Sequence, residues 1–301
     1  MRVIFIGCIG MSPKALLDQF KMLTPGASGE WGGVSGVTDI HKADIVVVLE
    51  GLPQHFHADM LRGKQVICIP LEPPIIRETK NFPPNATTLT LDRHPFVFHF
   101  LGFLNPKITY NELKALPAPA APKPKRVCII SSNIKLTASH IARYEFIKRL
   151  VRDLPGCDLF GYGWGDETPR IANYKGAFGN GYRGNKIKSA YAHKLDVLKE
   201  YQYVIVIENC RQCNYFTEKL TDVLLGWSYP IYYGAPNAPA LFPKGSLTCI
   251  DIKDYPRALA TIRETIRRPP TANMMEKIAA ARDKILDEYN IWPVVARAVK
   301  G

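Results

Sequence analysis

The stretch YQYVIVIENCRQCNYFTEKLTDVLLGWSYPIYYGAP, residues 201–236, decides the fold of this chain. Its first apolar run predicts a buried β-strand over 203–209. Residues 217–226 have apolar side chains at helical spacing and end in glycine, which predicts a helix, and PIYYG predicts a second strand over 230–234. A strand, a helix and a strand in this order form a βαβ unit, so we expect a parallel sheet here.

The same alternation runs through the rest of the chain and predicts an α/β protein. A proline-rich stretch, ALPAPAAPKPKR at 115–126, interrupts it and cannot lie inside a sheet. We therefore expect an N-terminal Rossmann-like domain over 1–116, a linker over 117–125 and a C-terminal Rossmann-like domain over 126–301, whose last helical segment is a candidate to pack back on the first domain. The other expected strands are 3–7, 44–51, 65–72, 126–132, 157–163 and 247–252, and the other expected helices are 13–22, 139–153 with Ser139 as N-cap, 187–200, 254–267 and 273–289.

The bulk composition predicts a globular protein with anionic partners. Hydrophobic residues make up 47% of the 301 residues, and the net charge is +12. Such a charge fits nucleic acid, an acidic membrane surface or phosphate-bearing substrates and does not choose among them. No window approaches the roughly 20 apolar residues of a membrane-spanning helix, so we expect membrane contact to be at most peripheral.

The cysteines predict a reduced, cytoplasmic protein without a zinc site. There are seven, scattered along the chain, and several lie inside apolar runs, where a cysteine acts as a small hydrophobic residue. Cys210 and Cys213 form a CxxC, with no second pair of metal ligands nearby.

The start of the helix at 217 is a candidate phosphate site. A helix start offers unpaired backbone N–H groups and a partial positive charge, and Lys219 adds a full charge beside them. Lys219 and Asp222 fall off the apolar stripe of this helix, so we expect Lys219 to lie outside the core. An ordinary surface pair of Glu218 and Lys219 is the alternative interpretation.

The residues of 201–236 resemble the signature of the α1,3/1,4-fucosyltransferase family, glycosyltransferase family 10. Three positions depart from the family pattern: Asn214 stands for a glycine, Phe216 for a valine and Tyr233 for a tryptophan. A second resemblance covers SSNIKLTASHIARYEFIKRL, residues 131–150. The matching residues are Ser132, Asn133, Arg143, Phe146, Tyr203, Glu208, Asn209, Tyr215, Thr217, Glu218, Lys219, Pro230, Ile231, Tyr232, Gly234 and Pro236.

The resemblance implies a GT-B fold, two Rossmann-like domains facing a cleft, and inverting transfer of fucose from GDP-fucose to a hydroxyl of a glycan or glycoconjugate. In this family such residues hold the donor: Arg143 and Lys219 at the diphosphate, Glu218 at the ribose, and Asn209, Tyr215 and Asn133 in the donor pocket. The resemblance also implies that no catalytic metal or other cofactor is required.

The catalytic base is expected to be a carboxylate of the N-terminal domain. Glu72, in IPLEPP, is the candidate that the resemblance favours, and Glu50, at the end of DIVVVLEG, is the alternative. Both follow apolar strands, so either could equally be a simple strand-terminal residue.

Other interpretations stay open at this point. The chain could be a GT-B transferase that uses another nucleotide sugar, a transferase-like protein that binds without turnover, or a basic nucleic-acid-binding protein, although no nucleic-acid-binding module is recognisable and we expect no such partner. His55 and His57 could form a metal pair only with further ligands. The glycine-rich residues 161–167 and the basic residues 180–194 are expected to form loops beside the cleft.

Overall fold

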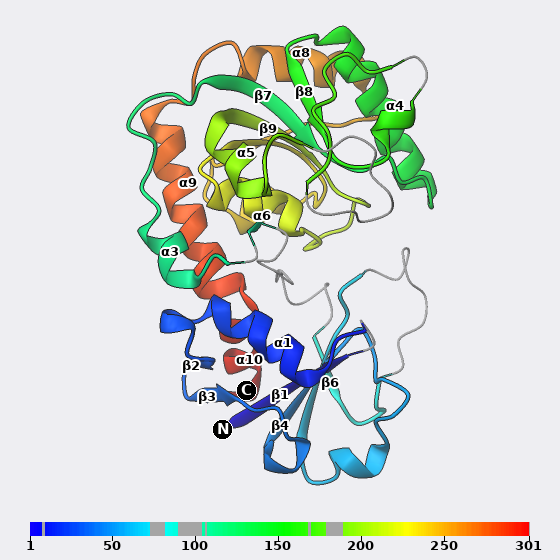
Figure 1. The fold of residues 1–301 in the computed structure, drawn as a ribbon, viewed down its shortest axis with the longest axis vertical. Helices are drawn as coiled ribbons and strands as arrows, with labels where there is room; N and C mark the ends of the chain where they lie inside the picture. The colour runs from blue at the N-terminus through cyan, green and yellow to red at the C-terminus, as the bar shows by residue number, and fades with distance from the viewer. Residues whose placement is uncertain are drawn as a thin grey trace. The chain divides into compact units, whose positions relative to one another are not determined.

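The computed structural model describes residues 1–7, 10–72, 82–89, 104–105, 107–167, 170–178 and 189–300. The chain divides into two compact units, which Figure 1 draws as a ribbon. Unit 1 comprises Met1–Gly102, Pro106–Leu116 and Asp283–Gly301, and unit 2 comprises Phe103–Asn105 and Pro117–Arg282. Each unit has its own, mostly parallel β-sheet.

Unit 1 is built on a six-stranded sheet in the order β2-β3-β1-β4-β5-β6. The pairs around β1, β4 and β5 are parallel, whereas β2 and β3 form an antiparallel hairpin. Gly32 and Gly33 make its two-residue turn, and both have a positive φ, 58° and 87°, which glycine adopts without strain. The strands are β1 (Arg2–Gly7), β2 (Glu30–Trp31), β3 (Val34–Gly36), β4 (Ile45–Leu49), β5 (Gln65–Ile69) and β6 (Thr87–Thr88).

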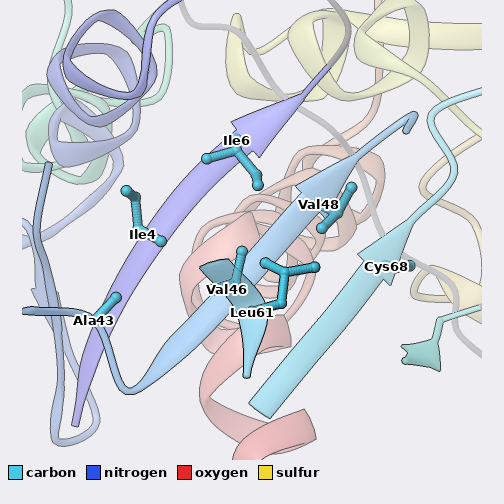
Figure 2. Packing of buried hydrophobic residues seen from close by; sticks show 7 residues of the cluster. All are labelled: Ile4, Ile6, Ala43, Val46, Val48, Leu61 and Cys68. Carbon is cyan, nitrogen blue, oxygen red and sulfur yellow. The ribbon is translucent and has the colours of Figure 1, made fainter. Parts of the chain in front are cut away.

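Both faces of this sheet are buried, as continuous apolar strands require. Side chains alternate between the faces along a strand, so Ile4 and Ile6 point to one side and Phe5 to the other. Figure 2 shows the first side, where the residues of β1, β4 and β5 gather with Leu61. On the second side Phe5 meets Phe20, at the end of α1 (Pro13–Phe20), with ring centroids 4.8 Å apart.

The C-terminal segment completes unit 1. Trp292, in α10 (Ile291–Lys300), is fully buried, lies 5.3 Å from Phe5 between ring centroids and donates its indole N–H to the carbonyl of Phe20 at 2.7 Å. A π-helical turn, Ile285–Tyr289, connects α10 to α9 (Ala272–Lys284). The turn is tied to α3 (Tyr110–Ala115), because Lys114 Nζ lies 2.6 Å from Asp287 Oδ2.

Unit 2 is built on a five-stranded parallel sheet in the order β11-β10-β9-β7-β8. Every residue of its central strand β9 is buried. The chain passes from β7 to β8 on one side and resumes with β9 on the other side of β7, so the strand order reverses between β7 and β9. The strands are β7 (Lys125–Ile130), β8 (Cys157–Phe160), β9 (Tyr201–Ile207), β10 (Tyr229–Tyr233) and β11 (Thr248–Cys249).

The helices of unit 2 are α4 (Ala138–Asp153), α5 (Lys194–Glu200), α6 (Glu218–Leu225), α7 (Ala238–Leu241) and α8 (Tyr255–Thr265), together with most of α9. The expectation for the start of α4 was wrong by two residues: Thr137, not Ser139, is the N-cap, and its hydroxyl accepts from the N–H of His140. The helix expected over 187–200 is shorter, since α5 begins at Lys194, and 187–188 lie outside the described residues. No helix in the described ranges is long and apolar enough to cross a membrane.

The end of the proline-rich segment is fixed to unit 2. Lys123 is buried, and its ammonium group donates to the carbonyls of Leu198 and Gly226, at 2.5 and 2.8 Å, and to Ser228 Oγ at 3.0 Å. The backbone carbonyl of Lys123 accepts from Gln202 Nε2 at 2.6 Å. These contacts fix where the chain enters β7.

We predict that Trp292→Ala destabilises the protein by about 3–5 kcal/mol, because it removes a large buried ring and leaves a cavity beside Phe5. Urea denaturation of the full chain followed by far-UV circular dichroism measures this. Met60→Ala, at a side chain that is exposed in the same unit, is the control and should change stability by less than about 0.5 kcal/mol. Equal effects of the two changes would contradict this role of Trp292.

Candidate active site

The loops after β7 and β9 lie side by side where the strand order of unit 2 reverses. In open parallel sheets, ligands bind beyond the carboxyl ends of the strands at such a reversal. The loop after β7 leads into α4, and the loop after β9 leads into α6. Both helices therefore begin at the edge of the sheet where a ligand is expected.

Glu208, the first residue after β9, fixes the start of α6. Its side chain is buried, with 1% of its surface exposed. One carboxylate oxygen accepts from the backbone N–H of Thr217 at 2.9 Å and the other from the Thr217 hydroxyl at 2.7 Å. Burial raises the pKa of Glu208, and the ammonium of Lys219, 3.9 Å away, opposes that rise.

Gly234, after β10, makes room for this carboxylate. A Cβ atom at this position would collide with the hydroxyl of Tyr232 and would lie 2.5 Å from Cγ of Glu208. The Tyr232 hydroxyl in turn accepts from the N–H of Ala235 at 2.9 Å. The glycine of PIYYG is therefore required by close packing against the buried glutamate.

The first turn of α6 carries one acidic and one basic side chain, Glu218 and Lys219. Thr217 caps the helix, since its hydroxyl accepts from the N–H of Lys219. Lys219 Nζ lies 3.1 Å from Glu218 Oε1, and both side chains are half-buried, as expected for residues outside the core. Burial lowers the pKa of Lys219, but Glu218 and Glu208 outweigh it and raise the pKa overall.

Asp222, in the next turn, differs from the expectation that it lies on the outer face. It is fully buried and forms an ion pair with Lys194 at 2.8 Å. Lys194 Nζ also donates to the carbonyl of Glu218 at 3.3 Å. The ammoniums of Lys219 and Lys194 overcome the effect of burial and hold the pKa of Glu218 below its usual value, so this carboxylate is ionised at neutral pH.

Arg143, in the second turn of α4, reaches the loop after β9. Its side chain is buried, with 2% exposed, and one terminal nitrogen donates to Oδ1 of Asn209 at 2.5 Å. Its Nε is sealed from solvent and has no hydrogen-bond partner among the described residues. Burial lowers the pKa of Arg143, and the negative charges of Glu208 and Glu218 act against that effect.

Tyr215 and Asn214 form the end of the same loop. Tyr215 is buried and close enough to Arg143 to affect its pKa. Asn214 has φ 62°, in the left-handed region that glycine adopts freely and that asparagine tolerates better than most residues. A pair of hydrogen bonds with Asn237, at 2.8 and 2.7 Å, holds it there. This backbone geometry explains how asparagine can stand where the family has glycine.

Asn133 is occupied by contacts within the fold. Its amide nitrogen donates to the carbonyl of Gly163 at 2.6 Å and to Glu167 Oε1 at 3.3 Å. Glu167 also accepts from the Tyr144 hydroxyl at 2.6 Å. Asn133 thus connects the loop after β7 to the glycine-rich loop 161–167, and no described contact joins it to Arg143 or Lys219.

The two candidate bases lie together in unit 1. Glu50 follows β4 with φ 61°, has 2% of its surface exposed, and accepts through Oε2 from the N–H groups of Leu71, at 2.5 Å, and Glu72, at 3.3 Å. Glu72 is half-buried. Glu50 therefore shapes the backbone that presents Glu72.

Two residues important for this geometry were not among the expected site residues. Glu208 matches the family signature, but the sequence predicts no role for it. His140 lies three residues before Arg143 on the buried side of α4, whereas its neighbour Ile141 is 48% exposed. The available signal was a histidine one helical turn before the arginine that was expected to bind the donor.

The remaining candidate metal ligands are not gathered into a cluster in the part of the chain that the structure describes. His55 lies in a turn, and His57 directly precedes the 3-10 turn Ala58–Leu61, so neither is on a strand. Cys210 is buried and Cys213 is exposed. Among the described residues no group of three or more potential metal ligands occurs together. Most of the basic segment 180–194 lies outside the described residues.

The arrangement in unit 2 is suited to an anion. Two helix starts, with unpaired N–H groups and partial positive charge, accompany a buried guanidinium and a half-buried ammonium. A guanidinium presents several N–H donors in one plane and can bind two oxygens at once. A phosphate or diphosphate group fits this chemistry.

Comparison with solved structures identifies the fold. A crystal structure of an α1,3-fucosyltransferase with GDP-fucose aligns with a TM-score of 0.50 and 15% sequence identity, over 94% of this chain and 82% of that chain. Another α1,3-fucosyltransferase crystal structure has a TM-score of 0.49 and 14% identity, over 93% of this chain and 82% of that one. The first likeness and the two parallel-rich sheets define a glycosyltransferase fold of the GT-B type, as predicted.

Comparison with protein families identifies the group within that class. Residues 120–272, more than half of the chain, match glycosyltransferase family 10 (fucosyltransferase), C-terminal part. The chain belongs to this family, as the sequence predicted. An α-(1,3)-fucosyltransferase of Helicobacter pylori, FucT, is 29% identical over 86 residues, which are 28% of this chain and 18% of FucT, so the match spans less than a fifth of that relative.

We predict that Glu208→Ala destabilises the protein by about 3 kcal/mol or more, because it leaves the Thr217 N–H and the positive charge of Lys219 without their buried acceptor. Urea denaturation measures the change. Glu264→Ala, which removes an exposed ion pair with Arg267, is the matched control and should cost at most about 1 kcal/mol. If both variants unfold at the same urea concentration, Glu208 does not organise the start of α6.

Proposed function

We propose that this chain transfers fucose from GDP-fucose to a hydroxyl group of a glycan acceptor, with inversion at the anomeric carbon. The observation that carries the proposal is the buried Arg143, whose Nε has no hydrogen-bond partner among the described residues, in a chain of glycosyltransferase family 10. A buried donor without a partner is costly, and an anionic ligand would remove that cost.

In this proposal unit 2 binds the donor and stabilises the leaving group. The acceptor oxygen forms a bond to the anomeric carbon, the bond from that carbon to the diphosphate oxygen breaks, and GDP leaves with the electron pair. Arg143, Lys219 and the N–H groups at the start of α6 offset the negative charge that develops. Glu218 contacts the ribose, while Asn209 and Tyr215 orient Arg143 and the donor pocket. Asn133 acts indirectly, by holding the loop after β7.

Unit 1 supplies the base and the acceptor side. Glu72 takes the proton from the acceptor hydroxyl, and Glu50 positions it through the backbone hydrogen bonds at Leu71 and Glu72. Glu50 has 2% of its surface exposed and Glu72 is half-buried, and this difference in accessibility supports the division of roles.

The proposal requires no metal ion or other cofactor, because Arg143 and Lys219 supply the positive charge that a metal would otherwise provide at the diphosphate. Transfer should therefore persist in excess EDTA. We also propose a cytoplasmic protein with at most peripheral membrane contact. The burial of four of the six described cysteines as free thiols supports a reducing compartment.

We predict that GDP and GDP-fucose raise the unfolding temperature, whereas UDP-glucose, UDP-N-acetylglucosamine and single-stranded DNA do not. A ligand at about 100 times its dissociation constant stabilises by about 2.7 kcal/mol, a readable shift. Stabilisation by UDP compounds alone would indicate a GT-B transferase with another donor. Stabilisation by DNA alone would favour a nucleic-acid-binding protein, the candidate that the charge of +12 supports.

The same measurement on two variants tests the site. Lys219→Ala should weaken GDP binding about 10- to 100-fold, because it removes a charge-assisted contact. Lys244→Ala, at an exposed lysine of the same unit, is the control and should bind GDP like the wild type. Unchanged binding by Lys219→Ala would remove Lys219 from the diphosphate site.

We predict that Glu72→Gln lowers the transfer rate about 10²- to 10⁴-fold without weakening GDP-fucose binding, because it removes only the proton acceptor. Glu50→Gln should chiefly lower stability and reduce transfer less. Rates with GDP-fucose and an accepted glycan, together with unfolding curves, separate these outcomes. If Glu50→Gln abolishes transfer and Glu72→Gln does not, Glu50 is the base.

A further inference from the structure

His140 occupies an inward position at the start of α4 that an apolar residue would normally fill. Its side chain is buried, with 5% of its surface exposed, and it lies on the same side of the helix as Arg143 and Tyr144. It is close enough to Lys219, at the start of α6, for the two groups to influence each other. His140 therefore lies on the buried side of α4 together with Arg143, within electrostatic range of Lys219.

One ring nitrogen of His140 is fixed and the other is available. Nδ1 lies 2.7 Å from the hydroxyl oxygen of Thr137, the N-cap residue, which also accepts from the backbone N–H of His140 at 3.3 Å. Nε2 makes no hydrogen bond within the described part of the chain, and it is not among the described side-chain atoms that are sealed from solvent. When the Thr137 hydroxyl donates to Nδ1, the hydrogen of the neutral ring is on Nε2.

The charges around His140 favour this neutral ring. Burial lowers the pKa of His140, and the positive charges of Arg143, on its own helix, and Lys219, on α6, lower it further. An imidazolium would add a third positive charge to this group. A neutral ring instead adds a hydrogen-bond donor without adding repulsion, and an incoming anion would be attracted by all three side chains.

We propose that His140 is a third diphosphate-binding residue, which donates a hydrogen bond from Nε2–H to a phosphate oxygen of the nucleotide beside Arg143 and Lys219. This inference rests on the proposed function, since it requires a diphosphate at this site. Arg143 and Lys219, whose positive charges act on His140, would attract an anion more strongly than a neutral ligand. Thr137 positions the ring through Nδ1.

The test compares GDP binding by three variants with the wild type in the full chain, by isothermal titration calorimetry. His140→Leu removes the donor and should weaken GDP binding about tenfold, whereas His140→Gln keeps an N–H donor and should recover most of the loss. Ile141→Ala, in the same helical turn but exposed, is the matched control and should bind like the wild type.

The pH dependence provides a readout that a purely structural role of His140 would not change. Bound diphosphate favours the imidazolium, so the pKa of His140 rises in the complex and protons bind together with GDP. GDP affinity of the wild type relative to His140→Gln should therefore increase from about pH 7.5 to about pH 5.5. The titration of GDP itself is common to both proteins and cancels in this ratio.

The outcomes separate this inference from the proposed function. A wild type that binds GDP with the same affinity and pH dependence as His140→Leu and His140→Gln would overturn the role of His140 alone. A wild type that binds no GDP compound would overturn both. If His140→Leu does not fold, the ratio of the GDP affinity of the wild type to that of His140→Gln decides. A ratio that increases as the pH falls supports the contact, and a ratio that does not change with pH overturns it.

Discussion

In unit 2 the carboxylate of Glu208 accepts hydrogen bonds from both the backbone N–H and the hydroxyl of Thr217, and it lies 3.9 Å from the ammonium of Lys219. It is almost completely buried, so these contacts are made without competition from water. They fix the end of β9 to the start of α6. The N-cap, the direction of the helix and the placement of Lys219 all depend on this one side chain, and the absence of a Cβ at Gly234 leaves room for it.

In unit 2 the ammonium groups of Lys194 and Lys219 form ion pairs with carboxylates, whereas the guanidinium of Arg143 forms no such pair among the described residues. Lys194 is paired with the buried Asp222, and Lys219 is paired with Glu218 and Glu208. Among the described residues, the Arg143 guanidinium donates to the neutral amide of Asn209, and its Nε has no hydrogen-bond partner. A buried guanidinium that lacks full compensation can bind an anion. This imbalance, rather than the net charge of the whole chain, is what supports a diphosphate site.

Much of the fold could be predicted because long apolar runs have few alternatives. The runs at 45–49 and 203–207 are buried strands, and the helix predicted over 217–226 spans Glu218–Leu225 and ends at Gly226. The hairpin of β2 and β3 was not predicted, since strands of two and three residues leave no periodic pattern. The burial of Asp222 depends on Lys194, 28 residues away, and periodicity within one helix does not reveal such a partner. The burial of His140 was not predicted for a related reason: the apolar pattern of a helix does not show which polar residues also point inward. The roles of the predicted site residues, including Glu72, stay predictions.

A crystal structure of the chain with GDP-fucose bound would test the central claim most directly. We predict that the diphosphate lies at the starts of α4 and α6, with phosphate oxygens within hydrogen-bonding distance of the Arg143 guanidinium and Lys219 Nζ. A nucleotide bound elsewhere on unit 2, with Arg143 still joined only to Asn209, would contradict the account.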